Sequence, residues 1–156
     1  MKLTDRVLKW LHSDPRFAAW TPDQSLVALD CLLAVVMADE RITEPEWERL
    51  MRELERLPWS WDEGSVKLRA RIEDARLRVE RRVEEVRDGR FQREVATRLA
   101  EPSLRRELYR MMVAIALADG LDAREQASLE HFRDAFALDR GAAERIIAAE
   151  RARLGA

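Results

Sequence analysis

Two acidic segments hold the side chains with the clearest potential for chemistry in this chain of 156 residues. Asp39 and Glu46 follow one apolar stretch, whereas Asp119, Asp122 and Glu125 follow a second one. A ligand set made only of carboxylate oxygens suits Ca²⁺, Mg²⁺ or Mn²⁺ better than zinc. If the fold brings the two segments together, these five residues form a candidate divalent-cation site. Neither segment has the loop pattern of an EF-hand, so we expect weak affinity.

The same acidic residues also fit a purely structural role at the start of two helices. Thr43 and Glu46 have the spacing of a capping box, in which the hydroxyl accepts a first-turn N–H and the glutamate accepts the N–H of the cap residue. Asp122 and Glu125 repeat that spacing. A carboxylate in the first turn also complements the helix dipole. Capping therefore accounts for these four residues without any ligand.

Asp39 and Asp119 are harder to explain by capping. Each follows an apolar helix, at the end where the helix dipole disfavours an anion by a few tenths to about 1 kcal/mol. Such an acid needs a compensating partner, which could be a backbone amide of the turn, an arginine or a bound cation. The sequence leaves these three alternatives open.

The elements that position these residues are expected to be helices. Ala, Leu, Arg and Glu dominate the composition, and no stretch alternates apolar and polar residues as a half-buried strand does. We expect helices over residues 4–12, 21–38, 43–57, 63–87, 90–100, 102–118 and 122–137. Residues 139–154 either extend the last of these or form a short eighth helix. Two of the helices, at 25–38 and 111–118, are apolar on all faces, which predicts that they form a buried central pair.

The two apolar helices begin an internal repeat. Each is followed by an Ala-Asp turn, a hydrophobic residue and an amphipathic helix that starts with acidic residues. With one residue missing from the second copy, Ala38-Asp39, Ile42, Glu46 and Leu50 align with Ala118-Asp119, Leu121, Glu125 and Leu129. The repeats, over about 25–57 and 104–137, can pair about a pseudo-twofold axis because each buries the apolar face that the other cannot cover alone.

The predicted fold is therefore an all-α, single-domain bundle of about seven helices built around two pseudo-twofold-related hairpins. The domain is expected to span residues 21–156, and residues 1–20 are expected to form an N-terminal helix and linker.

The repeat motif resembles a known family. An apolar helix followed by Ala-Asp-Gly, a hydrophobic residue and a glutamate is similar to the TerB-like family of tellurite-resistance-associated helical domains, and the signature also occurs in the N-terminal region of a membrane-anchored DnaJ-like co-chaperone. The resemblance covers about residues 21–150, including FQREVATRLAEPSLRRELYRMMVAIALADG. Glu40 replaces the usual glycine in the first turn, and the second turn, Asp119-Gly120-Leu121, is one residue short. The resemblance implies a stress-response module whose acidic residues chelate metal.

Asp30 and Arg110 occupy equivalent positions in the two apolar helices. An unpaired charge among apolar side chains is expensive. We therefore expect the two residues either to pair across the axis or each to find another opposite charge. Cys31, next to Asp30, is expected to be a small buried hydrophobic residue, with thiol redox chemistry as the alternative.

Residues 63–87 combine an apolar stripe with an arginine-rich face. Ion pairs are expected between Arg76 and Glu80, Asp74 and Arg78, and Arg81 and Glu85, which would make this face solvated and salt-bridged. The alternative is contact with an acidic protein or with lipid head groups. The candidate partner surface comprises Arg76, Arg78, Arg81, Arg82, Trp59 and Trp61. All five tryptophans fall near helix ends, where they are expected to fasten outer helices to the core.

Composition excludes several classes of function. A net charge of −2 disfavours a nucleic-acid binder, and one cysteine and two histidines exclude a disulfide framework and a zinc cluster. No apolar run is long enough to span a membrane, and the charged N-terminus does not resemble a secretory signal. No phosphate-binding loop or nucleophile–histidine–acid set is recognisable, so we expect no enzyme.

Three hypotheses remain. The first is a TerB-like stress-response module that binds a divalent cation at its acidic turns and couples this to a protein partner. The second is a metal-free helical adaptor whose acidic residues only cap helices. The third is a peripheral partner of a membrane-associated complex. We expect a cytoplasmic protein, with the inner-membrane surface as the alternative location.

Overall fold

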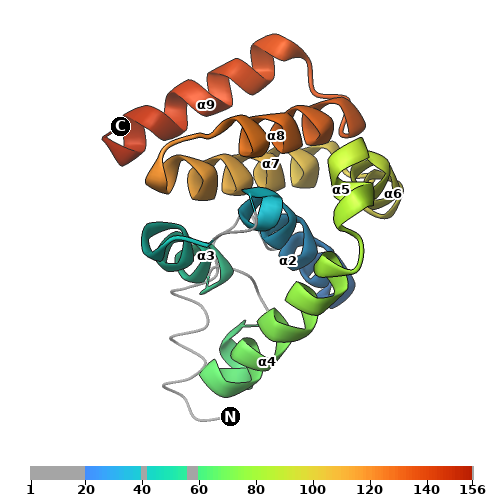
Figure 1. The fold of residues 1–156 in the computed structure, drawn as a ribbon, viewed down its shortest axis with the longest axis vertical. Helices are drawn as coiled ribbons and strands as arrows, with labels where there is room; N and C mark the ends of the chain where they lie inside the picture. Colours follow the sequence, from blue (N-terminus) through green and yellow to red (C-terminus); the bar gives the residue numbers. More distant parts are fainter. Residues whose placement is uncertain (1–19, 40–41, 56–59, 156) are drawn as a thin grey trace.

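The computed structural model describes residues 20–39, 42–55 and 60–155, and within them the chain is all-α with no strand. The predicted helix over residues 4–12 lies outside these ranges. The described α-helices are α2 (Pro22–Val36), α3 (Glu44–Glu55), α4 (Ser60–Glu80), α5 (Val83–Asp88), α6 (Arg90–Arg98), α7 (Pro102–Ala116), α8 (Ala123–Ala135) and α9 (Arg140–Leu154). Two 3₁₀ turns, η2 (Met37–Asp39) and η3 (Leu117–Asp119), follow α2 and α7 (Figure 1). The predicted fold class is confirmed.

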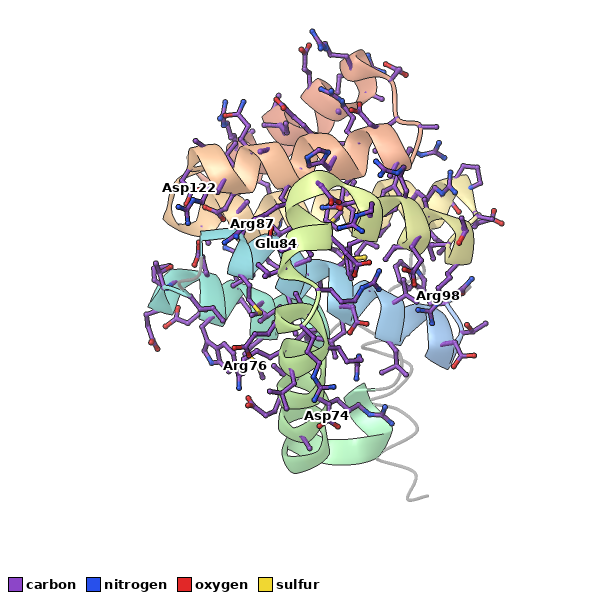
Figure 2. All side chains as sticks on the ribbon, turned by 45° about the vertical axis from the view of Figure 1, so that its right-hand side comes forward. Asp74, Arg76, Glu84, Arg87, Arg98 and Asp122 are labelled. Carbon is purple, nitrogen blue, oxygen red and sulfur yellow. The ribbon has the colours of Figure 1, made fainter. Side chains whose placement is uncertain are left out.

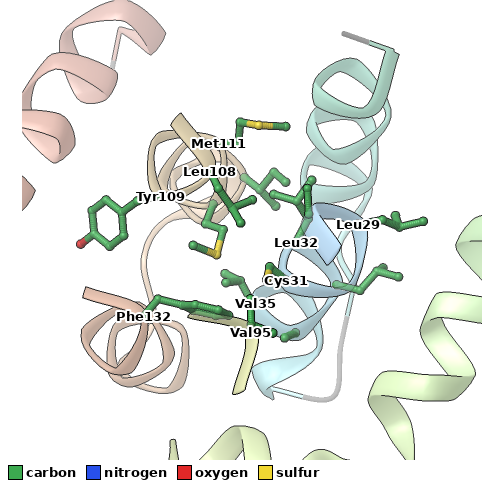
Figure 3. Close-up of a cluster of buried hydrophobic side chains, with 14 of the residues drawn as sticks. Leu29, Cys31, Leu32, Val35, Val95, Leu108, Tyr109, Met111 and Phe132 are labelled. Atoms are coloured by element: carbon green, nitrogen blue, oxygen red, sulfur yellow. The ribbon is translucent and has the colours of Figure 1, made fainter. Parts of the chain in front are cut away.

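Helices α2 and α7 form the centre of the bundle. Nearly every residue from Val27 to Val36 and from Met111 to Ala116 is buried. The two helices pack against each other, with Leu32 and Leu108 among the side chains of the core between them (Figure 3). A helix without a polar face has no side to turn to water, so these two must be enclosed by the others. The predicted central pair is confirmed.

The two hairpins are interlocked. Helix α3 of the first hairpin packs against turn η3 of the second, and helix α8 of the second packs against turn η2 of the first (Figure 1). This reciprocal contact is the arrangement expected of two repeats related by a pseudo-twofold axis. The aligned residues match in burial as well, because Leu50 and Leu129 are both buried while Ile42 and Leu121 are both partly buried against the core.

The prediction of one helix over residues 63–87 is wrong, because the chain breaks between α4 and α5. At the break, the N–H of Arg82 donates to the carbonyl of Val79, three residues back, at 2.9 Å. The break changes the neighbours of the chain, since α4 packs on α2 whereas α5 packs on α6. Arg82 holds the new direction through ion pairs with Glu85 of α5 and Glu94 of α6.

The C-terminal stretch forms a separate helix, which resolves the alternative left open by the sequence. Ala137 adopts a positive φ of 55° after α8, and the side chain of Asp139 then accepts a hydrogen bond from the N–H of Ala142 at 2.8 Å to cap α9. Helix α9 packs on α7. It therefore covers the outer face of the second hairpin.

The tryptophans do not share one role. Trp20 is buried in the core, as expected, but Trp47 is exposed, so the prediction that every tryptophan fastens a helix to the core is wrong for Trp47. No helix in the described part of the chain is long and apolar enough to cross a bilayer.

Candidate functional site

The acidic turns η2 and η3 end the two central helices and lead into the capped starts of α3 and α8. Before α3, the N–H of Thr43 donates to Glu46 Oε2 at 2.8 Å, and the N–H of Glu46 donates to Thr43 Oγ1 at 3.4 Å. Before α8, the N–H of Glu125 donates to Asp122 Oδ1 at 2.8 Å, and the N–H of Asp122 donates to Glu125 Oε1 at 3.4 Å. Both predicted capping boxes are confirmed.

Glu46 and Glu125 are buried to an extent that is unusual for glutamate. They are 2% and 1% exposed. Burial normally disfavours an ionised carboxylate, but here each one lies in the first turn of a helix, where the backbone N–H groups and the dipole favour a negative charge. The repeat thus encloses one first-turn carboxylate in each hairpin.

The interlocked hairpins place each buried glutamate on a helix that packs against the opposite turn. Glu46 is on α3, which packs on η3, and Glu125 is on α8, which packs on η2. Asp39 and Asp119 are the last residues of these turns. Their side chains lie outside the described ones, so the alternatives for their partners stay predictions. Among the described side chains, no group of three or more His, Cys, Asp or Glu is placed to hold a metal ion.

Arg110 of α7 is the centre of a buried ionic cluster. It is 13% exposed and pairs with Glu107 at 2.6 Å, Glu53 of α3 at 3.1 Å and Glu150 of α9 at 3.3 Å. Burial alone would lower the pKa of the Arg110 guanidinium, but the charges of Glu53 and Glu107 outweigh burial and raise the pKa. The cluster thus joins three helices through one permanently charged side chain.

Asp30 does not pair with Arg110. Each of the two residues instead pairs with another opposite charge, which confirms the second of the two predicted alternatives. Asp30 pairs with Arg78 of α4, with Asp30 Oδ1 2.7 Å from Arg78 Nη2. Each central helix therefore attaches outer helices through one of these two charges: Asp30 of α2 attaches α4, and Arg110 of α7 attaches α3 and α9.

Comparison with known proteins decides the family. The family model described as "Tellurite resistance protein TerB" matches residues 25–148. The chain belongs to the TerB family. This match spans both hairpins and the helices between them, so the recognised resemblance is confirmed. Members of this family are generally non-catalytic. No curated protein and no solved structure matches the chain.

The arginine-rich surface of this TerB domain is largely satisfied by its own acidic residues. Arg76 pairs with Glu73 and with Glu80, the latter at 3.0 Å as predicted. The other two predicted pairs do not form: Arg78 pairs with Asp30 rather than Asp74, and Glu85 pairs with Arg82 rather than Arg81.

Arg81 is exposed, while Trp59 and the side chain of Trp61 lie outside the described part of the chain. The labelled side chains of α4 and α5 can be followed in Figure 2. Arg76, Arg78 and Arg82 are thus ion-paired, as a salt-bridged face requires, although only one of the three predicted pairs forms. Contact of this surface with a partner stays a prediction.

Cys31 fits the structural interpretation. It is fully buried in the core of the TerB domain. Burial raises the pKa of its thiol, and the nearby charge of Asp30 raises that pKa further. Since the thiolate is the reactive form, this position does not favour redox chemistry.

The fold also creates a groove that sequence reasoning missed. It has a volume of about 710 Å³ and lies between η2, α4, α5 and α8. Its lining includes Arg124, Ser128 and His131. Their spacing of four and three residues was a readable signal that they share one face of α8. Nothing in the sequence indicated that α4 and α5 would supply the opposite wall.

Proposed function

We propose that this TerB domain is a non-enzymatic stress-response module, linked to tellurite resistance through its family, whose two acidic turns bind a divalent cation. Asp39 and Asp119 would supply ligands from the turns, with Glu46, Glu125 and Asp122 contributing from the starts of α3 and α8. Oxygen ligands of this kind suit Ca²⁺, Mg²⁺ or Mn²⁺. Binding would then be coupled to a protein partner through the surface around the turns.

The observation that carries the proposal is the reciprocal packing of α3 on η3 and of α8 on η2. Each buried glutamate therefore belongs to the helix that packs on the acidic turn of the other hairpin, which supports a shared site. Buried carboxylates close to a further acid repel each other unless a cation or a proton compensates them. A cation shared between turn and helix would supply that compensation and would also lock the two hairpins together.

The decisive variant replaces Glu46 and Glu125 by glutamine. Glutamine also completes a capping box, as Gln24 does with Thr21 at the start of α2, with distances of 2.9 and 3.2 Å. The double substitution therefore removes two charges and keeps the caps. We expect calorimetric titration with Ca²⁺, Mg²⁺ or Mn²⁺ to give binding heat for the natural chain and affinity at least about tenfold weaker for the variant.

A matched control is Asp139→Asn, which removes the capping carboxylate of α9. Asparagine caps as well as aspartate, and α9 packs on α7 rather than on either turn. This variant should bind the cation as the natural chain does. Absence of binding heat for all three cations, or unchanged affinity in the double glutamine variant, would contradict the proposal and favour the metal-free adaptor.

A further inference from the structure

The groove between η2, α4, α5 and α8 has one apolar wall and one polar strip. Val79, Val83 and Val86 line it from α4 and α5, and Met37 lines it from η2. Its volume of about 710 Å³ falls in the range of pockets that enclose small organic molecules, roughly 300–1,000 Å³. An apolar wall of this kind favours an aliphatic or aromatic group over water.

The polar strip belongs to one helix. Arg124, Ser128 and His131 succeed one another along a single face of α8, separated by one helical turn each, and all three line the groove. Arg124 supplies a guanidinium, Ser128 a hydroxyl and His131 an imidazole. These are hydrogen-bond donors that together recognise an anionic oxygen group.

The polar strip includes a side chain, Ser128, whose hydroxyl lacks a hydrogen-bond partner in the described part of the chain. Ser128 is 4% exposed, and its buried Oγ has no hydrogen-bond partner among the described residues. A buried hydroxyl without a partner costs free energy, so such groups usually find one. Rotation about the Cα–Cβ bond would turn this hydroxyl toward a ligand in the groove.

The charges that line the groove indicate a ligand with a single negative charge. Two of its three arginines are already paired, Arg76 with Glu73 and Glu80, and Arg87 with Glu84. Arg124, by contrast, forms no ion pair with any residue that the structure describes. One guanidinium beside one hydroxyl matches a carboxylate, which an arginine can bind through two parallel hydrogen bonds.

We propose that this groove binds an aliphatic carboxylate, with the head group on Arg124 and Ser128 and the chain along Val79, Val83 and Val86. The ligand class is an amphiphile of one carboxylate and an unbranched aliphatic chain, for which decanoate is the probe. The site uses none of the residues of the proposed cation site. The two proposals can therefore fail separately.

The test is calorimetric titration of the full chain with sodium decanoate in the presence of EDTA, which keeps the result independent of any cation. We expect decanoate to bind about fifteenfold more tightly than octanoate, because each of its two additional methylenes strengthens binding about fourfold when buried. Decanol, which has the chain without the charge, should bind at least about tenfold more weakly than decanoate. Equal binding of decanol and decanoate would overturn the role of the polar strip.

Two variants locate the site. Ala127→Phe places a ring in the groove from an exposed position on α8 and should abolish decanoate binding while leaving the thermal midpoint unchanged. Arg124→Gln should weaken binding about tenfold, whereas the matched control Arg106→Gln, on the exposed face of α7, should have no effect. No binding to the natural chain, or full binding to Ala127→Phe, would overturn the proposal.

Discussion

The two hairpins have the same fold and opposite central charges, and their surroundings differ accordingly. In the first hairpin Asp30 pairs with Arg78, whose side chain is 45% exposed, at the surface between α2 and α4. In the second, Arg110 is enclosed by glutamates from three helices. The two copies thus share a backbone pattern, but the charge of Asp30 is paired at the surface and that of Arg110 is paired in the interior. The comparison predicts unequal energetic consequences for equivalent positions.

The largest expected effect follows from replacing Arg110. Arg110→Met keeps much of the side-chain volume but leaves the buried Glu53 and Glu150 with only the partly exposed Arg153 as a cation in the described part of the chain. Breaking a buried ionic cluster in this way costs about 3–5 kcal/mol. Urea unfolding at neutral pH should show this loss as a lower midpoint. A loss under about 1 kcal/mol would mean that the cluster is no stronger than a surface pair.

Acid should reduce the difference in stability between the natural chain and Arg110→Met. Burial on its own would raise the pKa of Glu150, but hydrogen bonds from Arg153 and the charge of Arg110 outweigh burial and lower the pKa. A carboxylate with a lowered pKa stabilises the fold above its unfolded-state pKa of about 4.3, and this stabilisation is lost as the pH falls through the folded-state pKa. Lowering the pH from neutral to about 3 should therefore reduce the free energy of unfolding of the natural chain more than that of Arg110→Met. Urea unfolding at a series of pH values would measure both losses. Parallel pH profiles for the two proteins would contradict this.

The capping boxes should contribute equally in the two hairpins, unlike the central charges. Thr43→Ala and Asp122→Ala each remove the side chain that caps a helix, at a cost of about 1 kcal/mol. Thermal unfolding of the two variants in EDTA should give similar shifts. A difference between them of more than about 1 kcal/mol would show that the two acidic turns are not energetically equivalent.

The smallest effect is expected at Asp30. Asp30→Asn keeps the shape of the side chain and removes only an ion pair with a partly exposed arginine, which contributes up to about 1 kcal/mol. High salt should weaken the natural pair and leave the variant unchanged. A loss as large as that of Arg110→Met would remove the distinction between the two hairpins.

The sequence predicted the features that depend on local pattern. Both capping boxes and the apolar character of 25–38 and 111–118 are readable because they involve residues close together in the chain. The repeat is readable because the same local pattern occurs twice. Partners distant in the chain were not readable. Arg78 has an acid one turn away at Asp74, yet it pairs with Asp30, since tertiary packing of α4 on α2 brings the two together.

The break between α4 and α5 was missed for a related reason. The apolar stripe continues through Val79, Val83 and Val86 without a proline or glycine, so local signals favour one helix. The ion pair of Arg82 with Glu94 and its position 4.9 Å over the ring of Phe91 exist only once α6 is in place. The groove depends on the same break, because α4 and α5 form the wall that faces α8.

The interlocking of α3 with η3 and of α8 with η2 has a consequence for how the chain assembles. Each hairpin, taken alone, would expose the part of its apolar helix that the other hairpin covers. A chain cut within the segment that connects them should therefore regain its structure when the two pieces are mixed. Two intact chains could likewise exchange equivalent hairpins, because an element that is self-complementary within one molecule is equally complementary between two copies.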